Sequence, residues 1–317
     1  IDIFVITTVM PAVVAEIGGV EFYAWTTMLY MVGTIVGAAS GQHARALLGR
    51  RKGYVASGLI FLVGALGCAL SPNMAILLLF RTVEGIGGGL LMSQSMTLVN
   101  DLYTGRLRTR VLAAITTTWS IAAVIGPLIG GFWGNFGIWR GAFLTTSVLT
   151  LLFILAAWKV VPESEKGARQ RLPYRRLLLL GTSVILVGAS GQFDDLVLRG
   201  GLIVGGVLCL ILTLRLDRVE NNLFPRRVLS LFAPVGTAYW VFLLLSAAYT
   251  PLTIFLPLAL SQIYKLEPLW IGYVLTVFSI AWTVGSLGTA GWNDKWTRIV
   301  CASGLAITAV SILGISI

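Results

Sequence analysis

Charge is scarce in this 317-residue chain, in which Asp, Glu, Lys and Arg together make up 11% of the residues. A typical soluble domain is about a quarter charged. Hydrophobic residues make up 57% and the mean hydropathy is +0.89, so the chain lacks the polar surface that a soluble globule needs. The uncharged runs at 54–70, 111–133 and 269–290 are long enough to cross a hydrocarbon core about 30 Å thick. The sequence therefore predicts an α-helical integral membrane protein.

Histidine and cysteine are also scarce, with one His and three Cys. The cysteines Cys68, Cys209 and Cys301 lie inside or beside apolar runs and show no metal-ligand spacing. His43 has no acidic neighbour in the sequence, and no nucleophile is paired with a base. These absences predict no metal site, no cofactor and no enzyme. The net charge of +10 does not indicate nucleic-acid binding either, because the basic residues lie in short connections between hydrophobic runs.

What the chain does contain is a succession of apolar segments. We predict eleven of them, at residues 1–15, 22–42, 53–71, 74–100, 111–134, 139–160, 177–193, 200–214, 231–260, 269–291 and 299–317. The chain opens without Met inside one apolar run and closes inside another, so we expect it to be a fragment of a longer protein.

The basic residues are distributed unevenly over the connections. One alternating set holds nineteen of the twenty-three Lys and Arg residues and consists of 43–52, 101–110, 159–176, 215–227 and 292–298. The other set holds three, namely Arg140, Arg199 and Lys265. The positive-inside rule makes the first set cytoplasmic, and it predicts a cytoplasmic N-terminus.

The longest polar stretch, at 162–174, divides the chain. We expect a six-helix bundle with a cut first helix at 1–161, followed by a central cytoplasmic loop and two inserted helices at 162–227. The start of a second bundle is expected at 228–317.

Three ionisable residues fall inside the predicted membrane segments. Arg81 and Glu84 lie three residues apart on one helix face, roughly 12–17 Å deep, and Asp2 lies at a similar depth of roughly 20 Å. Ionisable groups at such depth usually face a bundle interior or a water-filled cavity. We predict that these three residues form a site for protons or substrate in one shared cavity. A mutually neutralising pair that only holds helices together is the structural alternative.

Small residues and aromatic residues give weaker signals. Glycines recur every four residues, which lets membrane helices approach closely, at Gly33–Gly37–Gly41, Gly85–Gly89, Gly126–Gly130 and Gly201–Gly205. Pro127 follows Gly126 in mid-segment and predicts a bend. Five deeper aromatic residues could line an apolar pocket, with core packing as the equal alternative; they are Trp119, Tyr239, Trp240, Tyr249 and Trp282.

Taken together, these motifs resemble the major facilitator superfamily, specifically its fourteen-span drug:proton antiporter branch. The matching stretches are 2–11 (DIFVITTVMP), 41–52 (GQHARALLGRRK), 81–89 (RTVEGIGGG) and 125–131 (IGPLIGG), the last followed by Trp139-Arg140. The segments at 177–214 are similar to the inserted pair of fourteen-span members. The resemblance implies a major facilitator-type bundle with about eleven of fourteen spans present.

The resemblance also assigns motif residues. It implies cytoplasmic gating loops at Gly41, Arg45, Gly49, Arg50 and Arg51, with a weaker second copy at Asp294, Lys295 and Arg298. It implies an antiporter motif at Gly126, Pro127, Gly130 and Gly131. Arg45 stands where the family has Asp, so we expect the gate to be latched differently here. Glu84 replaces a common Gln and adds an acid to the cavity.

The expected function is proton-coupled export of small amphipathic or cationic compounds by alternating access. The expected partners are a small-molecule substrate, protons and the lipid bilayer of a bacterial inner membrane, with the protein as a monomer. Two alternatives stay open: a proton-coupled transporter of a metabolite such as a sugar, an amino acid or a siderophore, and a degenerate sensor or scaffold that transports nothing.

Overall fold

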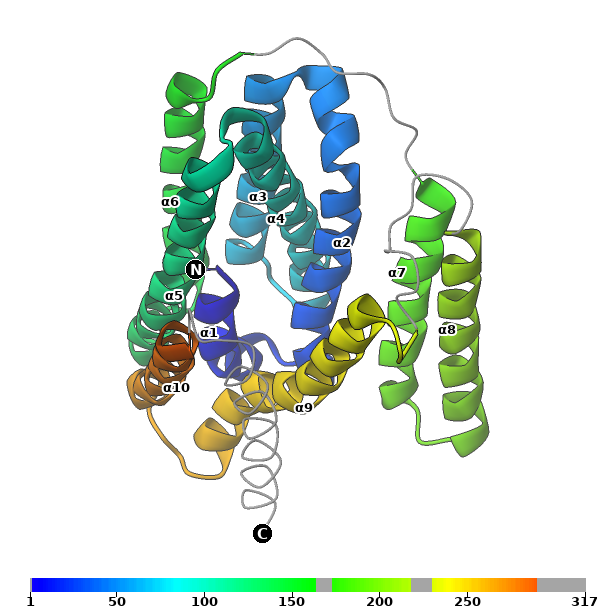
Figure 1. The fold of residues 1–317 in the computed structure, drawn as a ribbon. Coiled ribbons are helices and arrows are strands. Elements are labelled where there is room, and N and C mark those ends of the chain that lie inside the picture. The colour runs from blue at the N-terminus through cyan, green and yellow to red at the C-terminus, as the bar shows by residue number, and fades with distance from the viewer. Residues whose placement is uncertain (1, 164–172, 218–229, 290–317) are drawn as a thin grey trace.

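A computed structural model describes residues 2–163, 173–217 and 230–289. This part of the chain is helical and contains no strand, so the all-α prediction is confirmed (Figure 1). Its α-helices are α1 Asp2–Ile17, α2 Tyr23–Leu48, α3 Arg50–Ala69, α4 Met74–Leu102, α5 Gly105–Asn135, α6 Arg140–Val160, α7 Tyr174–Ala189, α8 Leu196–Leu216, α9 Pro234–Gln262 and α10 Pro268–Thr289. The segment predicted at 299–317 lies outside the described residues.

Six helical stretches in the described part are long and apolar enough to cross a membrane. They are Val20–Leu48, Arg50–Ala69, Met74–Leu102, Gly105–Asn135, Arg140–Val160 and Leu196–Leu216. The chain is therefore an integral membrane protein by the length and composition of its helices. We call the end of the bundle with the α2–α3 and α4–α5 connections the basic end, and the end with the α1–α2, α3–α4 and α5–α6 connections the opposite end (Figure 1).

Local chemistry explains where several helices begin and end. The Asn73 side chain accepts a hydrogen bond from the Ile76 amide at 3.0 Å and caps α4. The Asp195 side chain likewise caps α8. Gly49, with φ +78°, is the only residue between α2 and α3. The loop expected at 43–52 is therefore wrong in its extent.

Helix also extends into the predicted connection at 101–110, because α5 begins at Gly105. Long Arg side chains can reach from a helix end to the membrane surface while their backbone stays helical. A basic sequence at a segment end is thus compatible with a longer helix than hydropathy alone predicts.

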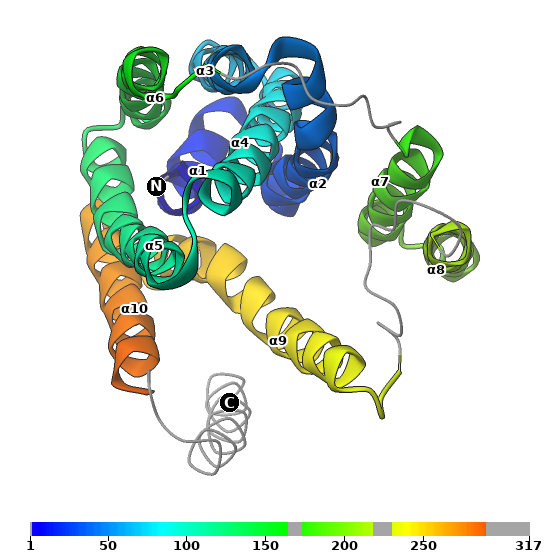
Figure 2. The same cartoon turned by 45° about the horizontal axis from the view of Figure 1, so that its top comes forward.

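Glycines bring α4 into backbone contact with two neighbours. On the α2 side, a Cβ added to Gly37 would lie 2.1 Å from the Ile86 carbonyl oxygen, and one added to Gly89 would lie 2.1 Å from the Thr34 carbonyl oxygen. On the α3 side, a Cβ on Gly64 would lie 2.4 Å from the Glu84 amide nitrogen. Because no side chain fits between these backbones, α4 lies fixed between α2 and α3 (Figure 2).

The apolar core lies toward the opposite end of the bundle. It packs one face of α1 against the ends of α2, α3, α4 and α6, and its members are Val5, Ile6, Val9, Met10, Val13, Tyr23, Cys68, Ala69, Met74, Leu77, Trp139, Ala142 and Phe143. This core holds α1 inside the bundle, with Asp2 at the start of the helix and Glu16 near its end.

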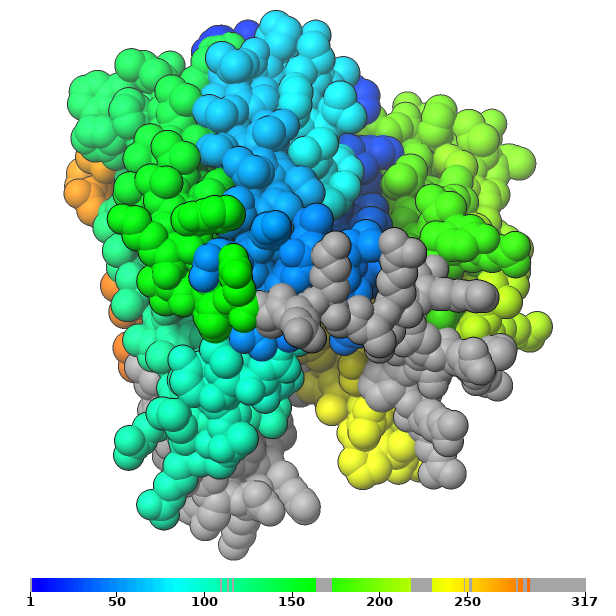
Figure 3. Space-filling view, turned by 90° about the horizontal axis from the view of Figure 1, so that it is seen from above, coloured from blue at the N-terminus to red at the C-terminus, as the bar shows by residue number. Residues whose placement is uncertain are grey.

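The remaining helices lie around this six-helix body. The α7–α8 pair lies beside α2, joined internally by a hydrogen bond from the Ser183 hydroxyl to the Gly206 carbonyl at 2.8 Å (Figure 3). A Cβ on Gly201 would meet nothing within 4 Å, so the close contact expected from the Gly201–Gly205 spacing is not made at Gly201. Helix α10 packs along α5, and α9 passes close to α1 (Figure 2).

Candidate functional site

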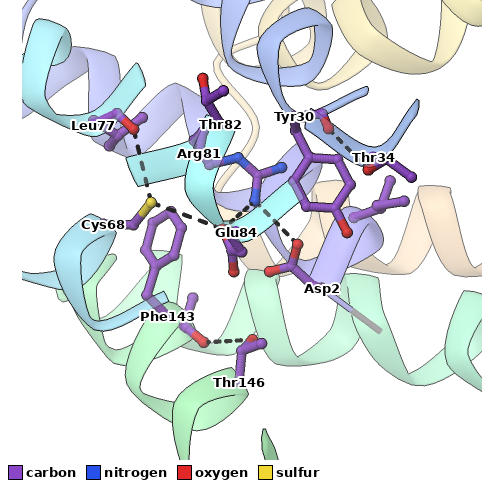
Figure 4. Close-up of polar contacts among 12 residues, drawn as sticks. Asp2, Tyr30, Thr34, Cys68, Leu77, Arg81, Thr82, Glu84, Phe143 and Thr146 are labelled. Atoms are coloured by element: carbon purple, nitrogen blue, oxygen red, sulfur yellow. Dashed lines mark hydrogen bonds and ion pairs between the residues drawn. The ribbon is translucent and has the colours of Figure 1, made fainter. Parts of the chain in front are cut away.

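The three ionisable residues singled out from the sequence lie together. Arg81 Nη1 donates to Asp2 Oδ2 at 3.0 Å and to Glu84 Oε2 at 2.6 Å (Figure 4). Asp2 comes from the start of α1, and the other two come from successive turns of α4. One guanidinium nitrogen therefore bridges two carboxylates that lie 82 positions apart in the chain.

Two residues of neighbouring helices complete this ion cluster. The Tyr30 ring of α2 lies under the Arg81 guanidinium, with 4.2 Å between the guanidinium carbon and the ring centre, a cation–π geometry. The Cys68 thiol of α3 lies 3.8 Å from Glu84 Oε2. Sequence reasoning did not find Tyr30 or place Cys68 at this site. The helical positions of Tyr30 and Arg81 gave no sign of contact, since only the glycine-mediated approach of α2 to α4 brings them together.

The cluster is buried and carries more acidic than basic groups. Asp2 is 7% exposed, Arg81 2% and Glu84 0%, so water screens their charges weakly. Two carboxylates face one guanidinium, and within the described residues Asp2 Oδ1, Glu84 Oε1 and Arg81 Nε have no hydrogen-bond partner. A buried charge without compensation is costly. The cluster is therefore chemically suited to take up one more positive charge.

Asp2 connects the cluster to a cavity of about 400 Å³. The cavity is lined by Asp2, Ile3, Phe4, Tyr30, Phe61, Leu91, Thr118, Trp119, Ala122, Thr146, Leu149, Thr150 and Phe153. Its walls are mostly apolar and aromatic, and Asp2 is the one charged residue among them. Arg81 and Glu84 lie behind Asp2 and Tyr30 and do not line the space. The shared cavity expected for all three residues is thus reached by Asp2 alone.

The predicted pocket aromatics are not gathered in one place. Trp119 lines the cavity, whereas Tyr239 is exposed and Trp240 and Tyr249 are partly buried on α9, away from it. The side chain of Trp282 lies outside the described part of the structure. The cavity takes its other aromatic walls from Phe4, Tyr30, Phe61 and Phe153. Helical spacing cannot show which of many aromatic residues face one space, because that depends on how the helices are rotated.

The α5 motif lies between two helices. Gly126, Pro127, Gly130 and Gly131 are all buried. A Cβ on Gly130 would lie 2.5 Å from the Val5 carbonyl oxygen of α1. A Cβ on the next residue, Gly131, would lie 2.9 Å from the Pro268 carbonyl oxygen at the start of α10. The motif thus allows both α1 and α10 to approach the backbone of α5 closely.

The residues expected in a gating loop are helical. Gly41 and Arg45 lie in α2, while Arg50 and Arg51 begin α3 after the Gly49 break. Arg45 and Arg50 both donate to Asp101 Oδ2 at the end of α4, Arg50 at 3.3 Å.

Arg51 makes the contacts to the end of α6. It donates to the Val161 carbonyl at 2.9 Å and to Glu163 Oε1 at 3.0 Å. Asp294, Lys295 and Arg298 of the second copy lie outside the described residues. In the described part, no three His, Cys, Asp or Glu residues are grouped so that they could hold a metal ion.

Comparisons with known proteins define the class of protein. A family model described as Major Facilitator Superfamily matches residues 1–317. The chain therefore belongs to the major facilitator superfamily, a family of membrane transport proteins, and the family predicted from the sequence is confirmed.

Individual relatives narrow the comparison. The chain is 30% identical to a protein of Mycobacterium tuberculosis named as a probable multidrug-efflux transporter, over 97% of this chain and 69% of that protein. It is 25% identical to multidrug resistance protein 3 of Bacillus subtilis, over 90% of this chain and 57% of that protein. It is 27% identical to the multidrug efflux pump SdrM of Staphylococcus aureus, over 72% of this chain and 52% of that protein. The chain thus spans between about half and about two thirds of these relatives.

Proposed function

We propose that this chain forms the substrate- and proton-handling part of a secondary active transporter that exports small amphipathic or cationic compounds in exchange for protons. The observation that carries the proposal is the buried Asp2–Arg81–Glu84 cluster, in which two acids share one cation. The efflux names of relatives that are 25–30% identical support the same class of substrate.

The charge balance explains why one site can serve both protons and cations. Arg81 compensates one carboxylate, and the second needs either a proton or another positive charge, because a buried uncompensated charge is costly. A proton on Asp2 and a cationic substrate beside Asp2 both satisfy that need. Binding of one therefore disfavours binding of the other, which is the exchange that antiport requires.

The surroundings favour amphipathic compounds. Asp2 borders a cavity whose other lining residues are apolar, aromatic or hydroxyl-bearing, and such walls suit a ligand with a large apolar body and one positive charge. Sugars and amino acids would need several polar partners, and Asp2 is the one charged lining residue. The cavity thus supports export of apolar cations over metabolite transport.

The rest of the mechanism follows from the family and from the charge distribution. We propose that the six-helix bundle of 1–161 moves relative to the bundle that begins at 228, and that the loop and two helices of 162–227 are inserted between these bundles in the sequence. The basic end faces the cytoplasm of a bacterial cell, because its connections hold most Lys and Arg. Contacts of α5 with α10 support a role for the antiporter motif between the two bundles. The Arg45, Arg50 and Arg51 contacts support a role for these residues in the cytoplasmic gate. The transporter acts as a monomer.

The test is dye-cation transport by the full-length protein in proteoliposomes with an imposed pH gradient. Asp2→Asn keeps the side-chain size and removes the titrating group, so proton-driven transport is expected to fall at least tenfold. Asp194→Asn, the same change at an exposed connection residue, is the control and is expected to transport normally. Full proton-driven transport by Asp2→Asn would overturn the proposal.

A further inference from the structure

A second polar cluster lies at the opposite end of the bundle and joins α1 to α6. Glu16, one residue before the end of α1, accepts two hydrogen bonds from consecutive residues at the start of α6. Trp139 Nε1 donates to Glu16 Oε2 at 2.7 Å, and Arg140 Nη1 donates to Glu16 Oε1. Both carboxylate oxygens are therefore engaged by different donors, which fixes the carboxylate plane as well as its position.

The two donors are themselves held in place. Trp139 is 1% exposed and packs edge-to-face on Phe143, with 6.0 Å between ring centres. The Arg140 guanidinium carbon lies 4.2 Å from the centre of the Trp139 ring, and Arg140 Nη2 donates to the Ser71 carbonyl at 3.3 Å. The start of α6 and the α3–α4 connection thus form a fixed support for Glu16. The sequence showed Trp139-Arg140 as a motif, but it gave no partner for it.

Helix geometry links this support to the ion cluster. Glu16 and Asp2 are fourteen residues apart on the same helix, which is close to four turns of 3.6 residues, so both carboxylates lie near one face. With side chains, a helix is about 10–12 Å across, so a rotation of about 10° moves a carboxylate by about 1 Å. Asp2 Oδ2 lies 3.0 Å from Arg81 Nη1, and a further 1 Å would break that hydrogen bond.

We propose that Glu16 is a positioning residue, which with Trp139 and Arg140 fixes the rotation of α1 that places Asp2 on Arg81. Its consequence for transport rests on the proposed function, whereas its consequence for the orientation of α1 does not.

Glu16 remains ionised over the pH range in which transport would be assayed. The hydrogen bond from Arg140 holds the pKa of Glu16 below its ordinary value. The pKa of Glu16 is lower in the folded protein than in the unfolded chain, where it is about 4.3. Ionised Glu16 therefore stabilises the fold above that unfolded-state pKa, and this stabilisation is lost as the pH falls through the folded-state pKa. Between pH 6 and pH 8 Glu16 therefore stays ionised and does not supply the transported proton.

The first test reads the orientation of α1 without any ligand. Ile3 lines the cavity beside Asp2, so the full-length protein carrying Ile3→Cys is labelled with a thiol reagent and the peptide is followed by mass spectrometry. Adding Glu16→Ala is expected to raise the labelling rate at least threefold, because a loosened α1 exposes position 3 more often. Glu16→Gln, which keeps an acceptor for Trp139, is expected to fall between. Glu21→Ala, an exposed acid at the same end, is the control and leaves the rate unchanged.

An unchanged labelling rate in both Glu16 variants would overturn the positioning role, whatever the transport result. If Glu16→Ala yields no folded protein, Glu16→Gln and Arg140→Lys give the same comparison with smaller changes in size.

The second test asks whether Glu16 acts through Asp2. Binding of the lipophilic cation tetraphenylphosphonium is measured in a double-mutant cycle. Glu16→Ala is expected to weaken binding about tenfold in the native background and less than twofold in the Asp2→Asn background. An equal loss in both backgrounds would contradict action through Asp2. If Asp2→Asn binds the probe as tightly as the native protein while the labelling difference persists, the proposed function fails and the positioning of α1 stands.

Discussion

The two helices that supply the ion cluster are held in different ways. Helix α4, which carries Arg81 and Glu84, meets the backbones of α2 and α3 through glycines on both sides. Helix α1, which carries Asp2, contains Pro11 and makes its close glycine contact through Gly130 of α5. Proline removes one helix hydrogen bond and allows bending. The comparison indicates an Arg81–Glu84 pair held by backbone contacts, and an Asp2 whose helix is held mainly by side chains of the core and by the Glu16 contacts. The Asp2–Arg81 contact can therefore be made and broken when those side chains rearrange.

The largest effect is expected from disturbing the fixed helix. A Leu side chain at Gly37 would have to occupy space already filled by the Ile86 carbonyl, which lies 2.1 Å from an ideal Cβ. Gly37→Leu is therefore expected to abolish folded protein, measured as the monodisperse fraction in size-exclusion chromatography. Gly201→Leu is the matched control, because a Cβ there meets nothing within 4 Å. Equal yields of the two variants would show that α2 and α4 need no backbone contact.

The second-largest effect is expected from removing Arg81, which contacts an acid on each of the two helices. Arg81→Ala leaves two buried carboxylates without their positive neighbour, and breaking a buried ion pair in this way typically costs about 3–5 kcal/mol. We expect a lower thermal unfolding temperature in detergent, and recovery of most of the loss when Asp2→Asn and Glu84→Gln are added. Arg199→Ala, at an exposed position on α8, is expected to unfold like the native protein. Absence of recovery in the triple variant would contradict the charge-balance account.

A smaller effect is expected from the acid on the fixed helix. Glu84 is fully buried behind Asp2 and does not line the cavity. Glu84→Gln keeps the shape of the side chain but removes one of the two negative charges, so Arg81 then compensates Asp2. Cation export is therefore expected to weaken and to cover a narrower range of cations without being lost. The measurement is export of a panel of dye cations, with Glu267→Gln at an exposed position as control. Complete loss of export in Glu84→Gln would place the essential acid on α4 instead of α1.

The smallest effect is expected at the basic end of α4. Arg45 and Asp101 are partly exposed, with side-chain exposures of 22% and 32%, and exposed ion pairs contribute about 0–1 kcal/mol. Since Arg50 also donates to Asp101, Arg45→Ala leaves one cation in place. We expect an unfolding temperature within a few degrees of the native value and a moderate fall in transport rate. A collapse in stability would show that this end of α4 is held mainly by charge.

The sequence predicted the charged residues of the site but not the residues that surround them. Asp2, Arg81 and Glu84 stand out because charges are rare in apolar segments, and depth alone suggested that they meet. Glu16 gave no comparable signal, because an acid at a segment end is common and its partners lie 123 and 124 residues away. The cavity walls were likewise hidden, since helix rotation selects Phe61 and Phe153 over other aromatic residues. The prediction of a loop around Gly49 was wrong because the basic residues there are helical, so that one residue separates α2 from α3.

The central claim is that a proton and a cationic compound compete to neutralise the uncompensated negative charge at Asp2. It is tested most directly by titrating the purified full-length protein with tetraphenylphosphonium in weakly buffered detergent solution near pH 7 and measuring proton release. The account predicts release of a proton on cation binding by the native protein and no release by Asp2→Asn. Cation binding by the native protein with no proton released would contradict it.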